Sequence, residues 1–168
     1  MTANHTVIAK LPIWDDLPSF GLQLKQLIEV ANSFIVPITG QQITKTMIQN
    51  YFKDGVLDTP EHQTYERKQV AGAIVVGMLK NVFSLNEIRN GLHWILTESA
   101  PQSGYDNFVN IFNEQAAENL LEPKSLKKIK LKSPSQSTIM QYGAVQTVLF
   151  WLFTKNSLQD GSRSGSTT

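Results

Sequence analysis

The segment of residues 69–79 constrains the fold more than any other part of this chain, because it contains no charged residue. Val70, Ile74 and Met78 are spaced by four residues, which is the period of one helix face. This spacing predicts a helix over residues 66–82, and apolar residues also occupy its other sides. A helix that is apolar all round is buried at the centre of a domain. We therefore expect a helical core built around this segment.

Amphipathic periodicity predicts five further helices, with capping residues at several of their ends. The helices are expected from residue 20 to a stop at Pro37 and over 44–53, 85–95, 106–121 and 138–153. The capping candidates are Ser19 and Thr44 as N-caps, Gly55 as the left-handed residue that ends a helix, and Ser84 with Glu87 as a capping box. Residues 101–104 are expected to form a loop. No alternating strand pattern longer than a few residues occurs, so the chain is predicted to be all-α.

Length and composition predict one well-buried domain with flanking segments. The chain has 168 residues, of which 41% are hydrophobic and only 17% are charged. A charged fraction this low argues against a disordered chain. Cysteine is absent, which excludes disulfides and thiolate metal sites. We divide the chain into an irregular N-terminal arm at 1–19, a helical domain at 20–121, a basic linker at 122–137, an apolar C-terminal helix at 138–156 and a mobile tail at 157–168.

Charge is distributed unevenly along the chain, although the net charge is only +1. Residues 1–120 carry 8 Lys and Arg against 12 Asp and Glu, and residues 121–168 carry 7 against 2. The basic surplus comes mostly from a run of lysines in the linker: Lys124, Lys127, Lys128, Lys130 and Lys132. Such a run either contacts phosphates or forms a solvated linker, and we prefer the linker.

The sequence contains no motif that supports catalysis or metal binding. None of the histidines has a second ligand three or four residues away, so no zinc helix motif is present; they are His5, His62 and His93. No glycine-rich phosphate loop occurs, because Gly72 and Gly77 lie within a predicted helix, where they permit close packing. Asp15 and Asp16 beside Trp14 suit either a cation or a solvated turn, and we prefer the turn. We expect a protein that is not an enzyme and has no metal or cofactor.

The N-terminus does not have the basic start and apolar run of a signal peptide. The longest apolar stretches are about ten residues, whereas a membrane-spanning helix needs ~20. We therefore expect a cytoplasmic protein that does not enter a membrane.

Three motifs follow one another within residues 43–92: the segment 44–57 (TKTMIQNYFKDGVL), Tyr65, and the segment 83–88 (FSLNEI). Together they resemble the winged helix-turn-helix of the MerR type. The first is similar to the second helix of that family, the tyrosine to the one that closes its wing, and the last to the start of its fourth helix. The resemblance implies a MerR-like core with a short or absent β wing and additional N- and C-terminal helices.

Three further motifs are LPIWDDLP at 11–18, TKTMIQNY at 44–51 and LKNVFS at 79–84. Over residues 11 to about 95, the chain resembles an uncharacterised bacterial family, domain of unknown function 1836, in which the middle motif is TKTMINNY. That family has no established activity, so the resemblance implies a fold and not a function. The chain departs from the family at residues 61–64 (EHQT), where basic residues are usual. This departure weakens a DNA-binding interpretation, because a wing that touches phosphates needs Lys or Arg.

Two functions stay open at this point. The first is a DNA-binding transcriptional regulator that reads the major groove of double-stranded DNA with the helix 44–53. Its candidate contacts are Gln49 and Asn50 to adenine, Lys45 and Lys53 to guanine or phosphate, Thr46 to a methyl or phosphate group, and Arg67 on the same positive face. The second is a non-enzymatic protein-interaction module that keeps the winged-helix fold without binding DNA. The net charge of only +1 over residues 41–92 favours this alternative.

The helix at 138–153 bears on the oligomeric state. It carries more apolar surface than one helix face can hide in a small domain, which suggests a homodimer with this helix at the interface. The alternative is that the helix closes the core of a single chain.

Overall fold

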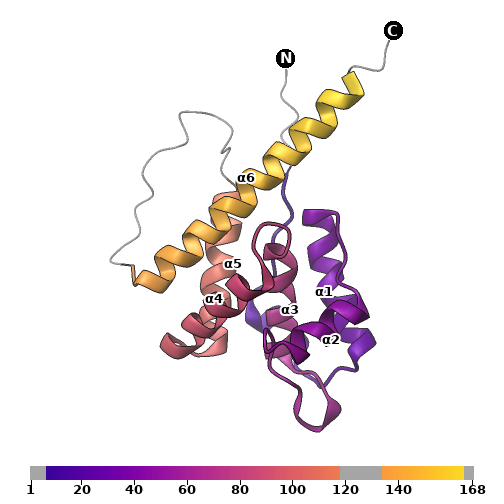
Figure 1. The fold of residues 1–168 in the computed structure, drawn as a ribbon, viewed down its shortest axis with the longest axis vertical. Helices are drawn as coiled ribbons and strands as arrows, with labels where there is room; N and C mark the ends of the chain where they lie inside the picture. The colour runs from indigo at the N-terminus through magenta and orange to yellow at the C-terminus, as the bar shows by residue number, and fades with distance from the viewer. Residues whose placement is uncertain (1–6, 118–133, 165–168) are drawn as a thin grey trace.

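The computed structural model describes residues 7–117 and 134–164 (Figure 1). These residues form α-helices and two short 3₁₀-helices, in the order η1 (Trp14–Asp16), α1 (Leu24–Thr39), α2 (Lys45–Lys53), η2 (Glu61–Gln63), α3 (Arg67–Leu79), α4 (Leu85–Glu98), α5 (Pro101–Ala117) and α6 (Gln136–Ser164). The described segments contain no β-strand, although a single antiparallel bridge joins Leu22 to Tyr65. The prediction of an all-α chain is therefore confirmed.

The helix α3 is buried at the centre of the molecule, as its apolar sequence predicts. All its residues from Gln69 to Leu79 are buried except Gly72, which is half-buried. It packs most extensively against α1 and also contacts α5 and α6. A Cβ atom at Gly77 would clash with the side chain of Ile35 in α1, so this glycine permits close packing as expected. The helix ends at Leu79 rather than at residue 82.

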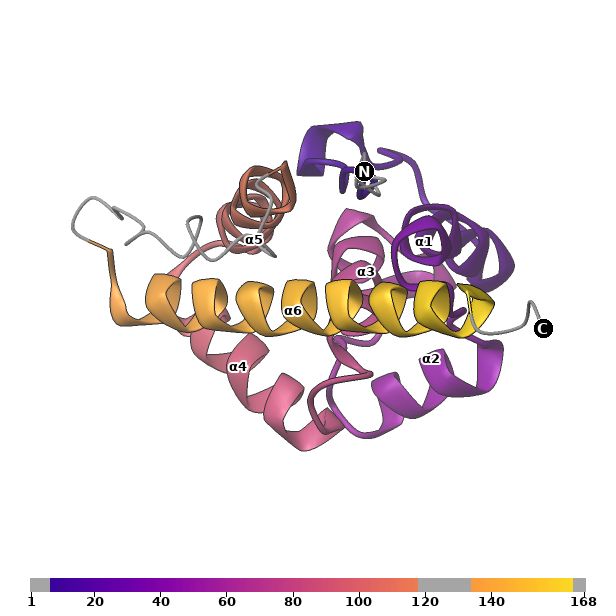
Figure 2. The same ribbon diagram turned by 90° about the horizontal axis from the view of Figure 1, so that it is seen from above.

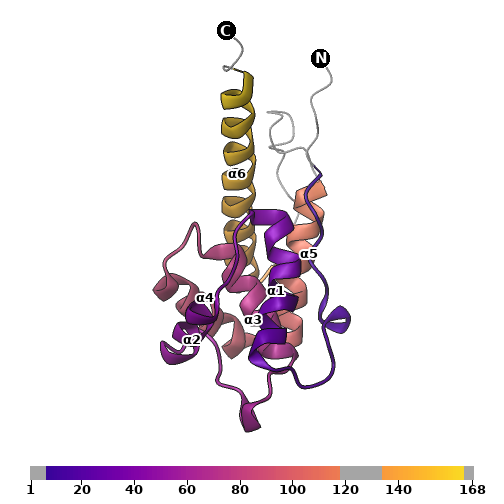
Figure 3. The same cartoon turned by 90° about the vertical axis from the view of Figure 1, so that its right-hand side faces the viewer.

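The long helix α6 lies across the other helices, with α4 and α5 on opposite sides of it (Figure 2). Its inner face is buried at Val145, Val148, Leu149 and Leu152. This face contacts α5 above all, and also α4 and α3. The inner face of α6 therefore closes the core of its own chain, which was the alternative to a dimer interface. The C-terminal end of α6 extends beyond the other helices (Figures 1 and 3).

Residues 7–19, the described part of the N-terminal arm, contain only the short helix η1, and α5 holds this segment in place through side chains. The amide of Asn113 accepts a hydrogen bond from the Leu11 N–H at 2.8 Å and donates one to the Leu11 carbonyl at 2.9 Å. The hydroxyl of Tyr105 donates to the Pro12 carbonyl at 2.8 Å. These bonds join the arm to a helix that is distant in the sequence, so the arm is an integral part of the fold.

The first helix begins later than the sequence predicts. Leu22 lies in extended backbone and exchanges two hydrogen bonds with Tyr65, at 2.8 and 2.9 Å, so the chain is not helical there and Ser19 is not the N-cap. Gln23 is the N-cap, and its N–H donates to the side chain of Gln26. At the other end, the helix continues through Pro37 to Thr39. A proline in the last turn removes only one helical hydrogen bond, so it does not stop the helix.

The last two helices also differ from the prediction. α5 begins at Pro101, so the expected loop at 101–104 is wrong; proline is well suited to the first position of a helix, where no intrahelical donor is needed. α6 extends to Ser164, so residues 157–164 of the expected tail are helical. Each residue added to an existing helix gains a hydrogen bond without a new nucleation cost, which composition alone does not reveal. The expected helical residues 118–121, the lysine run and His5 lie outside the described residues.

Candidate nucleic-acid interface

The turn between α1 and α2 is fixed by a glycine and an asparagine. α1 ends at Gly40, whose φ of 71° is left-handed. The Asn32 side chain of α1 then donates to the Ile43 carbonyl at 2.9 Å and accepts from the Ile43 N–H at 2.8 Å. As predicted, Thr44 caps α2, because its hydroxyl oxygen accepts a hydrogen bond from the Met47 N–H at 3.3 Å. These contacts set the direction in which α2 leaves α1.

One face of α2 is anchored in the core and the other is free. Ile48 and Tyr51 are buried, and Met47 and Phe52 are half-buried. The predicted contact residues Lys45, Thr46, Gln49, Asn50 and Lys53 are all exposed. None of these five side chains makes a hydrogen bond or ion pair with another described residue. The structure therefore brings five of the six candidate residues together as a free polar surface, which we call the outer face of α2.

The end of α2 is abrupt, as the sequence predicts. Gly55 adopts a left-handed φ of 68°, and the N–H groups of Val56 and Leu57 both donate to the Tyr51 carbonyl, at 2.9 and 3.1 Å. The connection 54–66 then projects at the end of the molecule opposite the C-terminus of α6 (Figures 1 and 3). This geometry leaves the outer face of α2 uncovered by the chain that follows it.

Tyr65 closes the connection 54–66. Its ring packs on that of Phe52, with centroids 5.5 Å apart, and its backbone pairs with Leu22. Residues 61–64 are exposed, and two of them have positive φ angles, 54° at His62 and 60° at Gln63. The connection therefore presents Glu61 and the imidazole of His62 to solvent, and no lysine or arginine.

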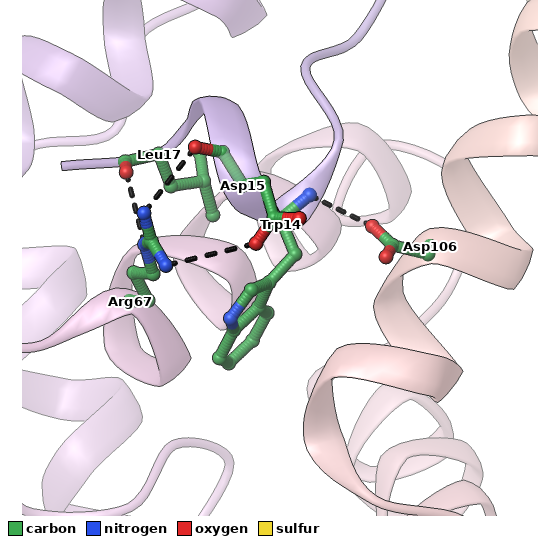
Figure 4. A network of polar contacts seen from close by, with 5 residues as sticks. All are labelled: Trp14, Asp15, Leu17, Arg67 and Asp106. Atoms are coloured by element: carbon green, nitrogen blue, oxygen red, sulfur yellow. Dashed lines mark hydrogen bonds and ion pairs between the residues drawn. The ribbon is translucent and has the colours of Figure 1, made fainter. Parts of the chain in front are cut away.

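The sixth candidate, Arg67, does not join the outer face of α2. Its guanidinium donates from Nε to the Leu17 carbonyl at 3.0 Å and from Nη2 to the Asp15 carbonyl at 3.2 Å (Figure 4). The Asp15 carboxylate lies 3.7 Å from Nη1. Beside it, the backbone N–H of Trp14 donates to the carboxylate of Asp106 in α5 at 2.7 Å. Arg67 therefore binds the N-terminal arm, a role that no local pattern indicates.

A cation that the sequence reasoning missed lies near the end of α2. Arg89 of α4 donates to the Asp54 carbonyl at 3.4 Å and to the side chain of Asn86 at 2.5 Å. The predicted capping box places this helix, because the Ser84 N–H donates to Glu87 at 2.8 Å and the Glu87 N–H donates to Ser84 at 3.2 Å. Only the fold brings Arg89 close to α2, since no spacing in the sequence links the two.

A groove of about 680 Å³ runs between α1 and α2 beside the outer face of α2. Half-buried Leu24, Ile28 and Val36 line it, together with Lys25, whose Nζ lies 3.8 Å from the Glu29 carboxylate. The groove is thus apolar at its base and nearly neutral at its edges.

His62 and His93 are exposed, and no three histidine or acidic side chains in residues 7–117 and 134–164 gather into a metal site. Within the same residues, every helix is too short or too polar to span a lipid bilayer.

The arm and the five helices α1–α5 thus form one all-helical domain with a free polar helix face. A family model described as a domain of unknown function, DUF1836, matches residues 12–115, and the chain belongs to this family. The match runs from the arm to near the end of α5, so α6 lies outside it. No curated protein and no solved structure matches the chain. The predicted resemblance to the DUF1836 family is confirmed, and membership of this family assigns no function.

Proposed function

We propose that this protein is a DNA-binding transcriptional regulator that places α2 in the major groove of double-stranded DNA. The observation that carries the proposal is the outer face of α2, where five polar side chains are exposed without partners among the described residues. A helix 10–12 Å wide with its other face fixed in the core has the dimensions that the major groove admits.

The order of the elements supports a MerR-like winged helix-turn-helix core. α1 and α2 are joined by a turn that contains a left-handed glycine, as is common in helix-turn-helix pairs. The connection 54–66 follows in the position of a wing, Tyr65 closes it, and α3 and α4 come next. The connection lacks paired strands in the described chain, which agrees with a short or absent β wing.

In this proposal the side chains of α2 divide between bases and phosphates. The amides of Gln49 and Asn50 suit adenine, which presents one donor and one acceptor in the major groove. Lys45 suits guanine or a phosphate, and Thr46 suits a thymine methyl or a phosphate. Lys53 is at the end of the helix, where Arg89 adds a second cation suited to the phosphate backbone.

The small number of basic residues on this surface implies that a single copy of the chain binds DNA weakly. The connection 54–66 offers Glu61 and His62 instead of basic residues, so few phosphates are neutralised per chain. Two copies on two half-sites would compensate, because paired contacts multiply affinity. We propose that the copies meet through α6, where Ile139 and Phe150 on the outer side are 44% and 39% exposed.

Selection of bound sequences from random duplex DNA with the full chain tests the proposal. On the preferred duplex, Asn50→Ala should relax one base position and cost about 1–3 kcal/mol. The matched control is Asn110→Ala, an exposed asparagine on α5. Lys53→Ala should weaken all duplexes alike and lower the salt slope by about one.

If no duplex is recovered even at low salt, DNA binding is wrong and the second candidate takes its place. That candidate is a protein-interaction module, and the observation that favours it is the groove between α1 and α2, with its apolar base and nearly neutral edges.

A further inference from the structure

A cavity of about 610 Å³ lies beside α3, between it and α4, α5 and α6. It exists because α4 packs mainly on α5 and α6 and stands away from α3. Small residues on facing helices widen it, among them Gly72 of α3, Gly91 of α4 and Gly143 of α6. Its volume is within the range of small-molecule sites in proteins.

Two of these glycines are not needed for packing. A Cβ atom at Gly143 would meet no atom within 4 Å, and one at Gly91 would meet only Met140, at an ordinary contact distance of 3.7 Å. Glycine in a helix interior is unfavourable relative to alanine, so both positions give up helix stability without a packing reason. Gly143 is exposed and Gly91 is half-buried, so the two glycines leave the rim of the cavity open beside α4 and α6.

The end of the cavity at the start of α3 carries hydrogen-bond donors without acceptors. Gln69 lines the cavity and is only 2% exposed. Its Oε1 accepts from the Glu66 N–H at 2.8 Å, whereas its Nε2 has no partner among the described residues. An amide nitrogen that has no protein acceptor can donate to an acceptor brought by a ligand into the cavity.

Two further donors lie at the same end. Trp14 lines the cavity, and Figure 4 shows its indole projecting from the arm between the helices that carry Arg67 and Asp106. The indole N–H makes no hydrogen bond to a described residue. Lys68 also lines the cavity and forms no ion pair within the described chain. Three residues with free donors, one of them cationic, therefore line this space.

The hydrogen-bond acceptors that line the cavity are either already bonded or exposed to solvent. The Gln141 amide donates to the Gly104 carbonyl at 2.9 Å and accepts from Asn107. The carboxylates of Glu87 and Asp58 line the cavity, but both residues are exposed, and Glu87 already accepts the Ser84 N–H. Asn90 also lines the cavity, but it is exposed, so the free hydrogen-bonding capacity of the less exposed lining is that of donors, within walls of apolar residues.

We propose that this cavity binds an amphiphilic monocarboxylate. The carboxylate accepts hydrogen bonds from Gln69 Nε2, Trp14 Nε1 and Lys68 Nζ, and the apolar body lies between α3, α4 and α6. Fatty acids and arylalkanoic acids share this chemistry. The proposal does not depend on DNA binding.

The test compares probes that differ only in their head group. The full chain is titrated with decanoate, 1-decanol and decylammonium below their micelle concentrations, followed by tryptophan fluorescence and calorimetry. Decanoate should bind about tenfold more tightly than decanol, the ratio that one charge-assisted hydrogen bond supplies. Tighter binding of decylammonium than of decanoate would overturn the proposal, because Asp58 and Glu87 would then set the specificity. Absence of saturable decanoate and 4-phenylbutyrate binding would overturn it too, and the ratio of these two affinities distinguishes a fatty acid from an aryl acid.

Two variants test whether the ligand binds in the cavity. Lys68→Met should weaken decanoate about tenfold and leave decanol unchanged, whereas Lys25→Met, an exposed lysine outside the cavity, should change neither. Gly143→Leu adds a side chain where space is open, so it should abolish decanoate binding without lowering the melting temperature. If Gly143→Leu and Lys68→Met both bind decanoate as the parent does, the ligand lies elsewhere and the proposal fails.

Discussion

Asn32 holds the turn between α1 and α2. Replacing it should therefore lower the free energy of unfolding more than is usual for a half-buried polar residue. Its amide satisfies both the N–H and the carbonyl of Ile43, a residue that is only 1% exposed. Asn32→Ala removes two hydrogen bonds of about 1 kcal/mol each and leaves two backbone groups without partners. Because the site is partly open to water, water can bond to these two backbone groups, which recovers part of the free energy lost when they are left without partners. We expect the free energy of unfolding to fall by about 2–3 kcal/mol.

Urea unfolding followed by far-ultraviolet circular dichroism measures this change. Ser33→Ala is the matched control, since Ser33 is the next residue, is exposed and bonds only to the Val30 carbonyl within its own helix. The control should shift stability by no more than about 0.5 kcal/mol. Asn32→Asp keeps the acceptor for the Ile43 N–H but loses the donor, so its loss should equal or exceed that of the alanine variant. The reasoning is refuted if Asn32→Ala and Ser33→Ala unfold at the same urea concentration.

Three further predictions follow from burial, helix propensity and ionisation. Ile74→Asp puts an unpaired charge into the fully buried face of α3 and should cost about 4 kcal/mol or more; a melting temperature equal to that of the parent would contradict the central position of this helix. Gly143→Ala should raise the free energy of unfolding by up to about 1 kcal/mol, because the new methyl group meets open space; a loss of stability in urea unfolding would show that the position is crowded. Burial raises the pKa of Tyr105, and the charges of Asp106 and Asp16 add to this, so the folded chain keeps a proton that the unfolded chain loses near pH 10. Stability contributed by this group should therefore be constant below about pH 10 and fall above it. The tyrosine absorbance at 295 nm should show a late component that is lost in Tyr105→Phe, although burial also raises the pKa of Tyr51 and Tyr142.

Local patterns predict the parts of this fold that local interactions decide. The cap at Thr44, the left-handed Gly55 and the Ser84–Glu87 capping box each involve residues within a few positions of one another, and each is confirmed. The central position of α3 also follows from its own composition.

Contacts between distant residues account for what the sequence could not predict. The start of α1 is set by the pairing of Leu22 with Tyr65, and Arg67 bonds with the arm rather than joining the outer face of α2. Arg89 lies near α2 because α4 returns to it. The cavity has no sequence signal at all, since it arises from where α4 does not pack. A periodic pattern shows which face of a helix is buried but not which element covers it.

The pairing of the arm with α5 has a consequence for folding during synthesis. The two hydrogen bonds between Leu11 and Asn113 join residues 102 positions apart. At a translation rate of roughly 5–20 residues per second, the arm is made about 5–20 s before its partner residue exists. The contacts between α1 and α3 are closer in sequence, so they can form during this interval, and Arg67 can already bind Asp15 and Leu17, whereas Leu11 has no partner. A nascent chain that ends before Asn113 would therefore leave Leu11 undocked on an otherwise folding core.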